Sequence, residues 1–540
     1  MVSNGSVCWW WSGAQDEATL GLARQLEAGD PIEGLRPIKV SDRRRVDAVP
    51  DVSGGLLLKT FHVRDSEATK YRVLPSRARS EYRMARALAR RGVPVPEALG
   101  YGEERDGSRL VRAWFIGRFI PEAPTLGDAM RRVAEVGDVD RVSSLARAAL
   151  GVLAGLQRHP FLHRDLHANN FLLAPDDRLL LTDLHSVWRV PRLTRSMRVA
   201  NLTRLMFSMR GALDLDRVGV LVREHAERTG ERVESFVLDV HASINAFDRG
   251  YVNGRTARCT KQSTLFTRES SEGGRSFRRR DYAGEELVTD LALHAETLAQ
   301  GGAGVLGQAP ASRVTRVGDE PGRRIVKEYT VRGAFSALRQ RVGLGRARSA
   351  WKGARRLEVL GIPTPRALAL EECADGSALL VTESLGDPPS LRTVTEQLAA
   401  GNEIPSRFAL SRALGNVVGR LARAGIRHDD LSSKNVLIVR TSAPSSRDVR
   451  TQPDPDWPSV HLIDLDNMTS MPPHDAYGLR RMLSQLCDLP DVVSRTDRLR
   501  FLRAFEAASG RALPREVGEA SLAGARARAA RRAAARPAPA

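Results

Sequence analysis

The sequence repeats one long pattern, and this repetition constrains the fold more than any other feature. Residues 80–103 (SEYRMARALARRGVPVPEALGYGE) and 349–372 (SAWKGARRLEVLGIPTPRALALEE) align without a gap. Each copy follows an apolar run that ends in a lysine, Lys59 or Lys327. Each precedes a His-x-Asp motif, with 106 residues from Lys59 to Asp165 and 103 from Lys327 to Asp430. A match in content, order and spacing predicts the internal duplication of a whole structural unit.

The hydrophobic pattern within each copy changes from strand-like to helix-like. Alternating apolar residues over 38–63 predict strands, and residues 80–91 predict a helix with Ser80 as its N-cap and Glu81 in its first turn. Residues 141–159 have the pattern of a long amphipathic helix. The second copy predicts helices over 349–360 and 407–424. We therefore predict an α+β fold of two tandem units, each with a small antiparallel β sheet and a mostly helical lobe.

Changes in composition suggest where these units begin and end. We assign residues 1–35 to an N-terminal extension, 36–250 to the first unit, 251–302 to a linking segment and 303–505 to the second unit. Residues 506–540 read as a low-complexity Arg/Ala/Pro tail, for which disorder is expected. The polar insertion at residues 440–459 is predicted to be a mobile loop. For the run Trp9-Trp10-Trp11, packing or a mobile end is favoured over a membrane interface.

Composition limits the class of protein and its partners. The four cysteines lie far apart and lack metal-type spacing, which favours a reducing compartment such as the cytoplasm. No secretion signal or membrane-spanning run is evident. The formal charge of +19 comes almost wholly from arginine. A basic surface attracts nucleic acid, anionic lipid or an acidic glycolipid, and composition does not choose among them.

The first His-x-Asp segment, residues 161–187, carries a set of residues suited to phosphoryl transfer. Asp165 would orient a hydroxyl group and accept its proton. Asn170 and Asp183 offer the oxygen ligands that Mg²⁺ prefers. His163 is expected to be structural, whereas His167 and His185 are left open between acceptor contact and packing.

The upstream lysine and glutamate complete this set. Only seven of the 83 basic residues are lysines, so a lysine at a strand end suggests a compact charge beside nucleotide phosphates. Lys59 would neutralise these phosphates, and Glu81 would hold Lys59 in place. The ordered set predicts a site for ATP and Mg²⁺ in a protein-kinase-like unit.

The second copy carries a less complete set. Asp430 matches the predicted base, and Asn435 and Asp464 match the predicted metal ligands. Lys327 matches the phosphate-binding lysine, but Ala350 stands where the first copy has Glu81. We therefore predict that the first unit is the active one and that the second is degenerate. Neither lysine is preceded by a G-x-G-x-x-G loop, so the sequence does not identify a loop that holds the phosphates.

These motifs resemble one known family. The sequences HRDL (163–166), NFLL (170–173) and DLH (183–185) of the first copy are similar to the lipopolysaccharide core heptose kinase and Kdo kinase family, as are residues 346–370, 381–387, 428–438 and 462–466 of the second. The resemblance implies a two-lobed kinase fold that uses ATP and Mg²⁺ to phosphorylate an inner-core sugar at the cytoplasmic face of the inner membrane. It also implies an anionic glycolipid or sugar as acceptor, with peripheral contact to an anionic membrane. A nucleic acid partner is not expected, and the oligomeric state is not predicted.

Two other functions are consistent with the same residues. A protein serine/threonine kinase would have the same base and metal ligands, but it normally shows a longer segment after the metal-binding aspartate, ending in A-P-E. Neither copy has that motif. A catalytically idle binding or scaffold protein could keep the fold without transferring phosphate.

Overall fold

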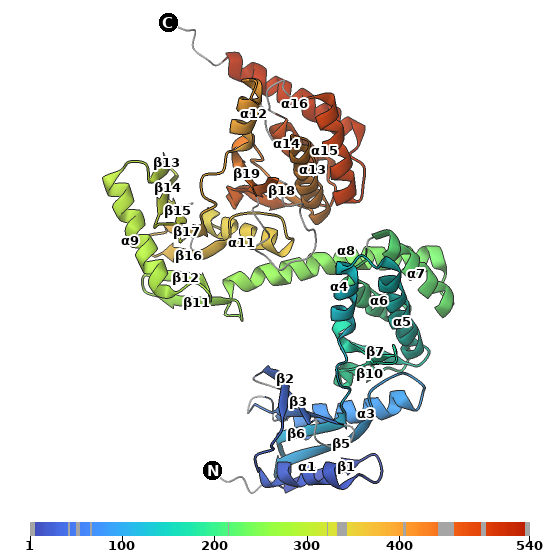
Figure 1. The fold of residues 1–540 in the computed structure, drawn as a ribbon. Helices are drawn as coiled ribbons and strands as arrows, with labels where there is room; N and C mark the ends of the chain where they lie inside the picture. The colour runs from blue at the N-terminus through green and yellow to red at the C-terminus, as the bar shows by residue number, and fades with distance from the viewer. Residues whose placement is uncertain are drawn as a thin grey trace. The chain divides into compact units, whose positions relative to one another are not determined.

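The computed structural model describes residues 6–41, 44–49, 55–64, 67, 69–213, 215–320, 322–331, 343–402, 407–440, 458–487 and 493–534. The chain divides into two compact units, residues 1–248 and 249–540 (Figure 1). In each unit an antiparallel sheet precedes a group of helices along the chain. The predicted α+β class and the tandem arrangement are confirmed.

The first unit begins with a six-stranded antiparallel sheet in the order β1-β5-β6-β4-β3-β2. Lys59 lies on β4 in this sheet, between β3 and β6. The strands are β1 (Ser6–Trp11), β2 (Arg36–Ser41), β3 (Arg44–Val49), β4 (Leu56–His62), β5 (Ala98–Asp106) and β6 (Arg109–Arg118).

The segment assigned to an N-terminal extension is part of this sheet. Strand β1 pairs with β5, so that Trp11 lies opposite Gly100. A Cβ atom on Gly100 would lie 2.4 Å from Cε3 of Trp11, so the glycine leaves the space that the indole ring needs. Helix α1 (Glu17–Ala28) begins at the N-cap Asp16 and buries Leu22 in the same apolar cluster. The tryptophan run therefore has a packing role in the sheet.

Helix α3 (Arg77–Ala89) carries Glu81 and begins earlier than predicted. Its N-cap is Ser76, whose hydroxyl oxygen accepts a 3.0 Å hydrogen bond from the amide of Arg79. Ser80, the predicted cap, lies inside the helix and donates its hydroxyl to the carbonyl of Ser76. This start places Glu81 on the buried face with Tyr82, facing the sheet.

The rest of the first unit is mainly helical and contains two short two-stranded sheets. Strand β7 pairs with β10 and β8 with β9, and the loops between these strands carry the candidate site residues. The helices are α4 (Leu126–Glu135), α5 (Val139–Gln157), α6 (Arg195–Met209), α7 (Leu215–Thr229) and α8 (Val233–Ala257), whose last residues belong to the second unit. The strands are β7 (Phe161–His163), β8 (Phe171–Leu173), β9 (Leu179–Leu181) and β10 (Val187–Arg189).

The second unit begins with a seven-stranded antiparallel sheet in the order β11-β12-β16-β17-β15-β14-β13. Strand β12 pairs with β16 as β1 pairs with β5, so the predicted linking segment belongs to this sheet. The strands are β11 (Phe266–Ser271), β12 (Gly274–Arg279), β13 (Val305–Ala309), β14 (Ser312–Val317), β15 (Arg324–Tyr329), β16 (Ala367–Cys373) and β17 (Ala378–Glu383), and the helices beside them are α9 (Gly284–Gln300) and α11 (Arg346–Val359).

The helical part of the second unit extends into the segment assigned to a disordered tail. Helix α16 (Arg515–Ala534) buries Val517, Ser521 and Ala525, and Arg528 donates to the backbone of Ser484 on α14 (Ala476–Leu486). Residues 535–540 and the predicted mobile loop, except at its ends, lie outside the described residues. The other elements are α12 (Leu391–Ala399), α13 (Arg407–Ala424), β18 (Ile426–His428), β19 (Val436–Arg440), β20 (Pro458–Leu462), β21 (Met468–Ser470), α14 (Ala476–Leu486) and α15 (Arg495–Ser509).

Among the described helices, none combines the length and apolar composition needed to cross a membrane.

Candidate active site

Lys59 and Glu81 form a buried ion pair in the first unit. The Lys59 ammonium on β4 contacts Oε1 of Glu81 on α3, and the two residues are only 7% and 2% exposed. The ring of Phe115 on the neighbouring strand β6 lies beside the same ammonium, with its centroid 5.6 Å away. Removing either partner would leave a buried charge unpaired, which is costly. The fold thus brings together the lysine and glutamate that the sequence predicted as a pair.

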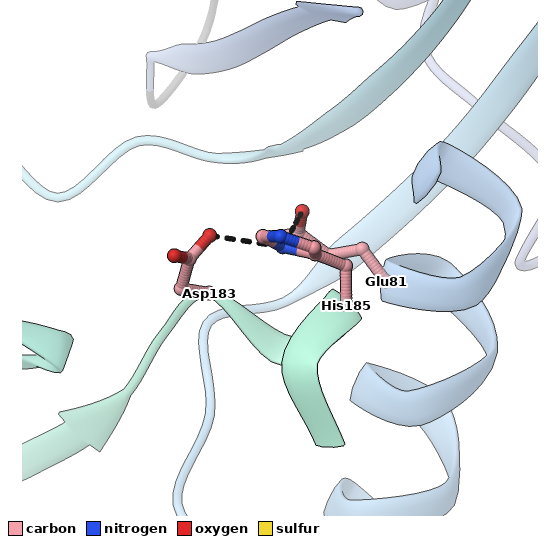
Figure 2. Close-up of side chains that lie close together, drawn as sticks. All are labelled: Glu81, Asp183 and His185. Carbon is pink, nitrogen blue, oxygen red and sulfur yellow. Dashed lines mark ion pairs between the residues drawn. The ribbon is translucent and has the colours of Figure 1, made fainter. Parts of the chain in front are cut away.

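Asp183 lies close to this pair, in the turn after β9. Its Oδ1 atom is 2.7 Å from Nη1 of Arg44 and 3.0 Å from Nδ1 of His185. His185 lies between the two carboxylates, because its Nδ1 is also 3.9 Å from Oε2 of Glu81 (Figure 2). The site therefore contains two carboxylates surrounded by Lys59, Arg44 and His185.

The backbone and the charge of Asp183 are both unusual. Its φ angle of 59° is left-handed, a conformation that non-glycine residues seldom adopt. Asp464 in the second unit has the same conformation, with φ of 60°. Burial acts to raise the pKa of the Asp183 carboxyl, whereas the neighbouring His185 lowers it. With the charges of Lys59 and Arg44 added, the pKa falls well below its usual range, so the carboxyl is ionised at neutral pH.

The loop after β7 holds Asp165 and Asn170. The Asn170 side-chain amide donates a 2.7 Å hydrogen bond to the carbonyl of Asp165, and the amide of Asp165 donates to Nδ1 of His163 at 3.2 Å. Asn170 is 5% exposed, whereas the Asp165 side chain is 69% exposed. The loop backbone is thus fixed while the Asp165 carboxylate stays accessible to a substrate. His167 lies beside it, with Nε2 3.8 Å from Oδ2 of Asp165.

His163 supports this loop from beneath. The residue is fully buried, and its carbonyl accepts a 2.7 Å hydrogen bond from the side chain of Asn201 on α6. Burial lowers the pKa of His163 to about 4, although the nearby backbone of Thr182 opposes this shift. The ring is therefore neutral at physiological pH. This geometry is that of a structural residue.

The residues around Asp183 fit a hard divalent cation. The hydrogen bond that Asn170 makes uses its Nδ2, so its side-chain oxygen is left for a ligand role. Thr182, the neighbour of Asp183, donates its backbone amide to the carbonyl of Asn170 at 2.8 Å, which links the two predicted ligands. Oε2 of Glu81 is buried and accepts no hydrogen bond in the described structure. Ligand atoms of Glu81, Asp183 and His185 all lie within 4.8 Å of one another. Oxygen ligands of this kind suit Mg²⁺.

The second unit pairs its lysine differently. Ala350 is buried where the first unit has Glu81, and the Lys327 ammonium contacts Oδ1 of Asp464 directly. Burial acts to raise the pKa of Asp464, but the charge of Lys327 lowers it. The predicted phosphate-binding residue therefore neutralises the predicted metal ligand.

The predicted base of the second unit is also engaged. The side-chain amide of Asn435 donates to the carbonyl and to Oδ2 of Asp430, in both cases at 2.9 Å. Asp466 occupies the place of His185, and its buried carboxylate lies 2.6 Å from Nη2 of Arg346. In the second site the lysine is thus paired with Asp464 and the predicted base with Asn435.

The structure adds residues that the sequence did not single out. Arg44 was not predicted at all, and His185 was left open. The Arg44–Asp183 contact joins residues 139 positions apart, so no local motif contains both. The strand pattern around Lys59 is the only feature of the sequence that could have indicated Arg44. Side chains on the same face of neighbouring strands lie close together, so an arginine on the preceding strand can reach the site of Lys59. Arg164 stacks on Trp188 with its guanidinium 3.8 Å from the ring centroid.

Comparison with known protein families identifies the family of this chain. The model of the lipopolysaccharide kinase (Kdo/WaaP) family matches residues 62–236 and 311–470. A solved structure described as WaaP in complex with acyl carrier protein has 24% identity and a TM-score of 0.32, over 44% of this chain and 90% of that one. The Mycobacterium tuberculosis PknI kinase domain has 19% identity and a TM-score of 0.27, over 40% of this chain and 98% of that one. No curated protein matches the sequence.

The two matched segments contain both sets of candidate residues except the strand lysine of the first unit and Arg44. They also lie in the same order in the two units and together span more than half of the chain. The chain therefore belongs to the lipopolysaccharide kinase (Kdo/WaaP) family of phosphotransferases, which act on a sugar hydroxyl.

Proposed function

We propose that the first unit transfers the γ-phosphoryl group of ATP, with Mg²⁺ as cofactor, to a hydroxyl of an inner-core sugar of lipopolysaccharide. Family membership supports a kinase of the lipopolysaccharide core, and the proposal adds the metal, the working unit and the sugar position. The observation that carries it is the buried Lys59–Glu81 pair next to an ionised Asp183.

Each residue of the first site has a proposed role. Lys59 binds nucleotide phosphates and is held in position by Glu81. Asn170 and Asp183 hold Mg²⁺, whose charge offsets that of the phosphates when it is bound. Asp165 accepts a hydrogen bond from the acceptor hydroxyl. The hydroxyl oxygen forms a bond to the γ-phosphorus, the bond to the bridging oxygen of ADP breaks, and the hydroxyl proton passes to Asp165.

We propose a weaker nucleotide site in the second unit. The Lys327–Asp464 contact supports this proposal, because binding of Mg²⁺ by Asp464 would first have to break it. Asp430 and Asn435 would otherwise take the roles of base and metal ligand. The ion pair supports degeneracy more strongly than the absence of Glu81 alone.

The charge of the chain supports an anionic glycolipid acceptor. A formal charge of +19 favours approach to a phosphate-bearing surface. We propose that the chain works in the cytoplasm, in peripheral contact with an anionic membrane where such an acceptor is presented.

Transfer of labelled phosphate from ATP tests the proposal. We expect incorporation into purified lipopolysaccharide core oligosaccharide and a loss of about a hundredfold or more in Asp165→Asn, since the base contributes this much to transfer. The matched control is Asp176→Asn, an exposed aspartate in the following hairpin that pairs only with Arg178 in the described structure. Both variants remove one exposed carboxylate from the same segment.

A generic protein acceptor runs in parallel with the oligosaccharide. Phosphate found only in protein would overturn the sugar-kinase proposal and favour the protein kinase. Undiminished transfer in Asp165→Asn, with loss in Asp430→Asn, would assign the activity to the second unit.

A further inference from the structure

We propose that Arg44 binds the nucleotide phosphates in the first unit and replaces the backbone amides of a glycine-rich loop. This inference rests on the proposed function and names a phosphate-binding residue of that site. Arg44 is the first residue of β3, in the hairpin that precedes the lysine strand. A hairpin in this position covers the phosphates when it is rich in glycine, but this one has no G-x-G-x-x-G sequence.

The pleat of the sheet places Arg44 on the same face as Lys59. In the antiparallel pairing of β3 with β4, Val46 lies opposite Lys59 and Arg44 lies opposite Phe61. Opposite residues share a face, and the face repeats every second residue. Arg44 and Lys59 therefore point to one side of the sheet. The intervening Arg45 points to the other side, where it pairs with Asp47.

The position of the Arg44 side chain is defined by contacts at both ends. Its backbone amide donates to Oγ of Ser41 at 3.2 Å, and that hydroxyl donates to the Arg44 carbonyl at 3.0 Å, which joins the ends of the hairpin. Its guanidinium contacts Asp183 at 2.7 Å, and only 19% of the side chain is exposed. An arginine anchored in this way loses little further freedom on binding a ligand.

The second unit is a natural comparison. Val314 lies opposite Lys327 in the pairing of β14 with β15, as Val46 lies opposite Lys59. The residue two positions before Val314 is Ser312, so the second unit has serine where the first has Arg44. Arg313 corresponds to Arg45 and pairs with Glu328 on the other face. The unit whose lysine is already paired with its metal ligand is thus the unit without this arginine.

The chemistry of the guanidinium suits this role. Arginine carries five donors in a planar fork that matches phosphate oxygens, and it stays charged at all physiological pH values. Asp183 holds this fork in the described structure. If Asp183 takes up a metal ion together with the nucleotide, the donors of Arg44 become available to the phosphates beside it. The side chain would then supply the positive contact that backbone amides supply in a glycine-rich loop.

Calorimetric titration of the full chain tests this role by binding alone. All variants carry Lys327→Ala, so that the first unit dominates the signal. We expect Arg44→Ala to weaken binding of Mg·ATP by about tenfold or more, as for loss of a charged hydrogen bond. Arg44→Lys should recover part of this loss, and binding of AMP should change little, because AMP lacks the outer phosphates. Arg45→Lys, which keeps a positive charge beside the buried Asp47, is the control on the opposite face and should bind as the parent does.

The outcomes separate this inference from the function on which it rests. If Lys59→Ala abolishes binding and Arg44→Ala binds Mg·ATP as tightly as the parent or more tightly, Arg44 is only a partner of Asp183 and the inference is wrong. If Arg44→Ala weakens ATP and AMP equally, the residue supports the fold of the site and the inference also fails. If the parent itself binds no nucleotide, both the proposed function and the inference about Arg44 are wrong.

Discussion

Lys59 and Lys327 occupy the same place in their sheets but contact different carboxylates. In the first unit Glu81 holds the lysine, and Asp183 is left to Arg44 and His185. In the second unit Ala350 offers no carboxylate, and the lysine pairs with Asp464. A lysine that has an ionic partner of its own does not compete with a metal ion for the neighbouring aspartate. The identity of one helix residue thus determines which charges of the site are available to a nucleotide.

A buried histidine away from the site makes stability depend on pH. Burial lowers the pKa of His225 on α7 to about 4, and the charge of Arg228 adds to the shift. In the unfolded chain histidine titrates near pH 6.5, at about its ordinary pKa. Between these pH values the unfolded chain binds a proton that the folded chain does not, so the free energy of unfolding falls as pH falls through this window. His225→Gln should reduce the fall from pH 7 to pH 5 by about 2 kcal/mol.

Urea unfolding of the parent and the variant at the two pH values checks this prediction. The comparison uses the difference between pH values, so a constant loss of the 3.2 Å contact between His225 and Gln157 cancels. The same pH dependence in both chains would show that His225 is protonated in the folded state.

Helix α13 packs against α15 in the second unit through glycine. A Cβ atom on Gly415 would lie 2.3 Å from the carbonyl oxygen of Phe501, a backbone atom that cannot rotate away. Gly415→Ala should therefore destabilise the second unit by about 1–3 kcal/mol, the usual cost of overpacking. Helix α5 precedes the loop that carries Asp165 as α13 precedes the loop that carries Asp430, and a Cβ atom on Gly155 of α5 would meet none of the described atoms within 4 Å. Gly155→Ala is thus the control, with neutral or higher stability expected because alanine favours helix.

Thermal unfolding of the two glycine variants measures this difference. An unchanged melting temperature in Gly415→Ala would mean that the two helices can separate without cost. A loss in Gly155→Ala as large as in Gly415→Ala would show that helix geometry, and not close approach, limits both positions.

Elements with a strong local pattern were predicted well, and elements defined by distant partners were not. The amphipathic pattern gave α13 its observed bounds, Arg407–Ala424. Strand β12 has one clear apolar residue, Phe277, and a buried Arg279 whose guanidinium reaches the carbonyl of Ala367, 88 positions away. Helix α16 was read as a tail from its low complexity, although alanine and arginine are both strong helix formers.

The residues of the candidate site also divide into those that a local sequence motif predicts and those that distant partners define. Asp165, Asn170 and Asp183 stand in one short motif, so their chemistry is visible in the sequence. The pairing of Lys59 with Glu81 follows from a recognised order of elements. Arg44 depends on the closure of the sheet over the loop, and only the three-dimensional arrangement brings it to Asp183. His185 is two residues from Asp183 and contacts it locally, but its approach to Glu81 also requires the fold.

At the scale of the whole molecule, the duplication has given two units with separate cores and different sites. One apolar cluster lies wholly within the first unit and another wholly within the second. Because each unit buries its own core, changes in the second site need not affect the stability of the first. The second site could therefore lose its glutamate and its arginine while its fold was kept.

The difference between the first and the second site predicts one tight nucleotide site per chain. Titration of the intact protein with Mg·ATP should give one tight equivalent, with a second at least about tenfold weaker, since the second site lacks a charged donor and must break the Lys327–Asp464 pair. Lys59→Ala should remove the tight equivalent, because it leaves Glu81 buried without its partner and the phosphates without their cation. Lys352→Ala, at an exposed lysine of α11, is the matched control and should leave both equivalents in place. Two equivalents of equal affinity, or a tight equivalent that survives Lys59→Ala, would contradict the assignment of the working site to the first unit.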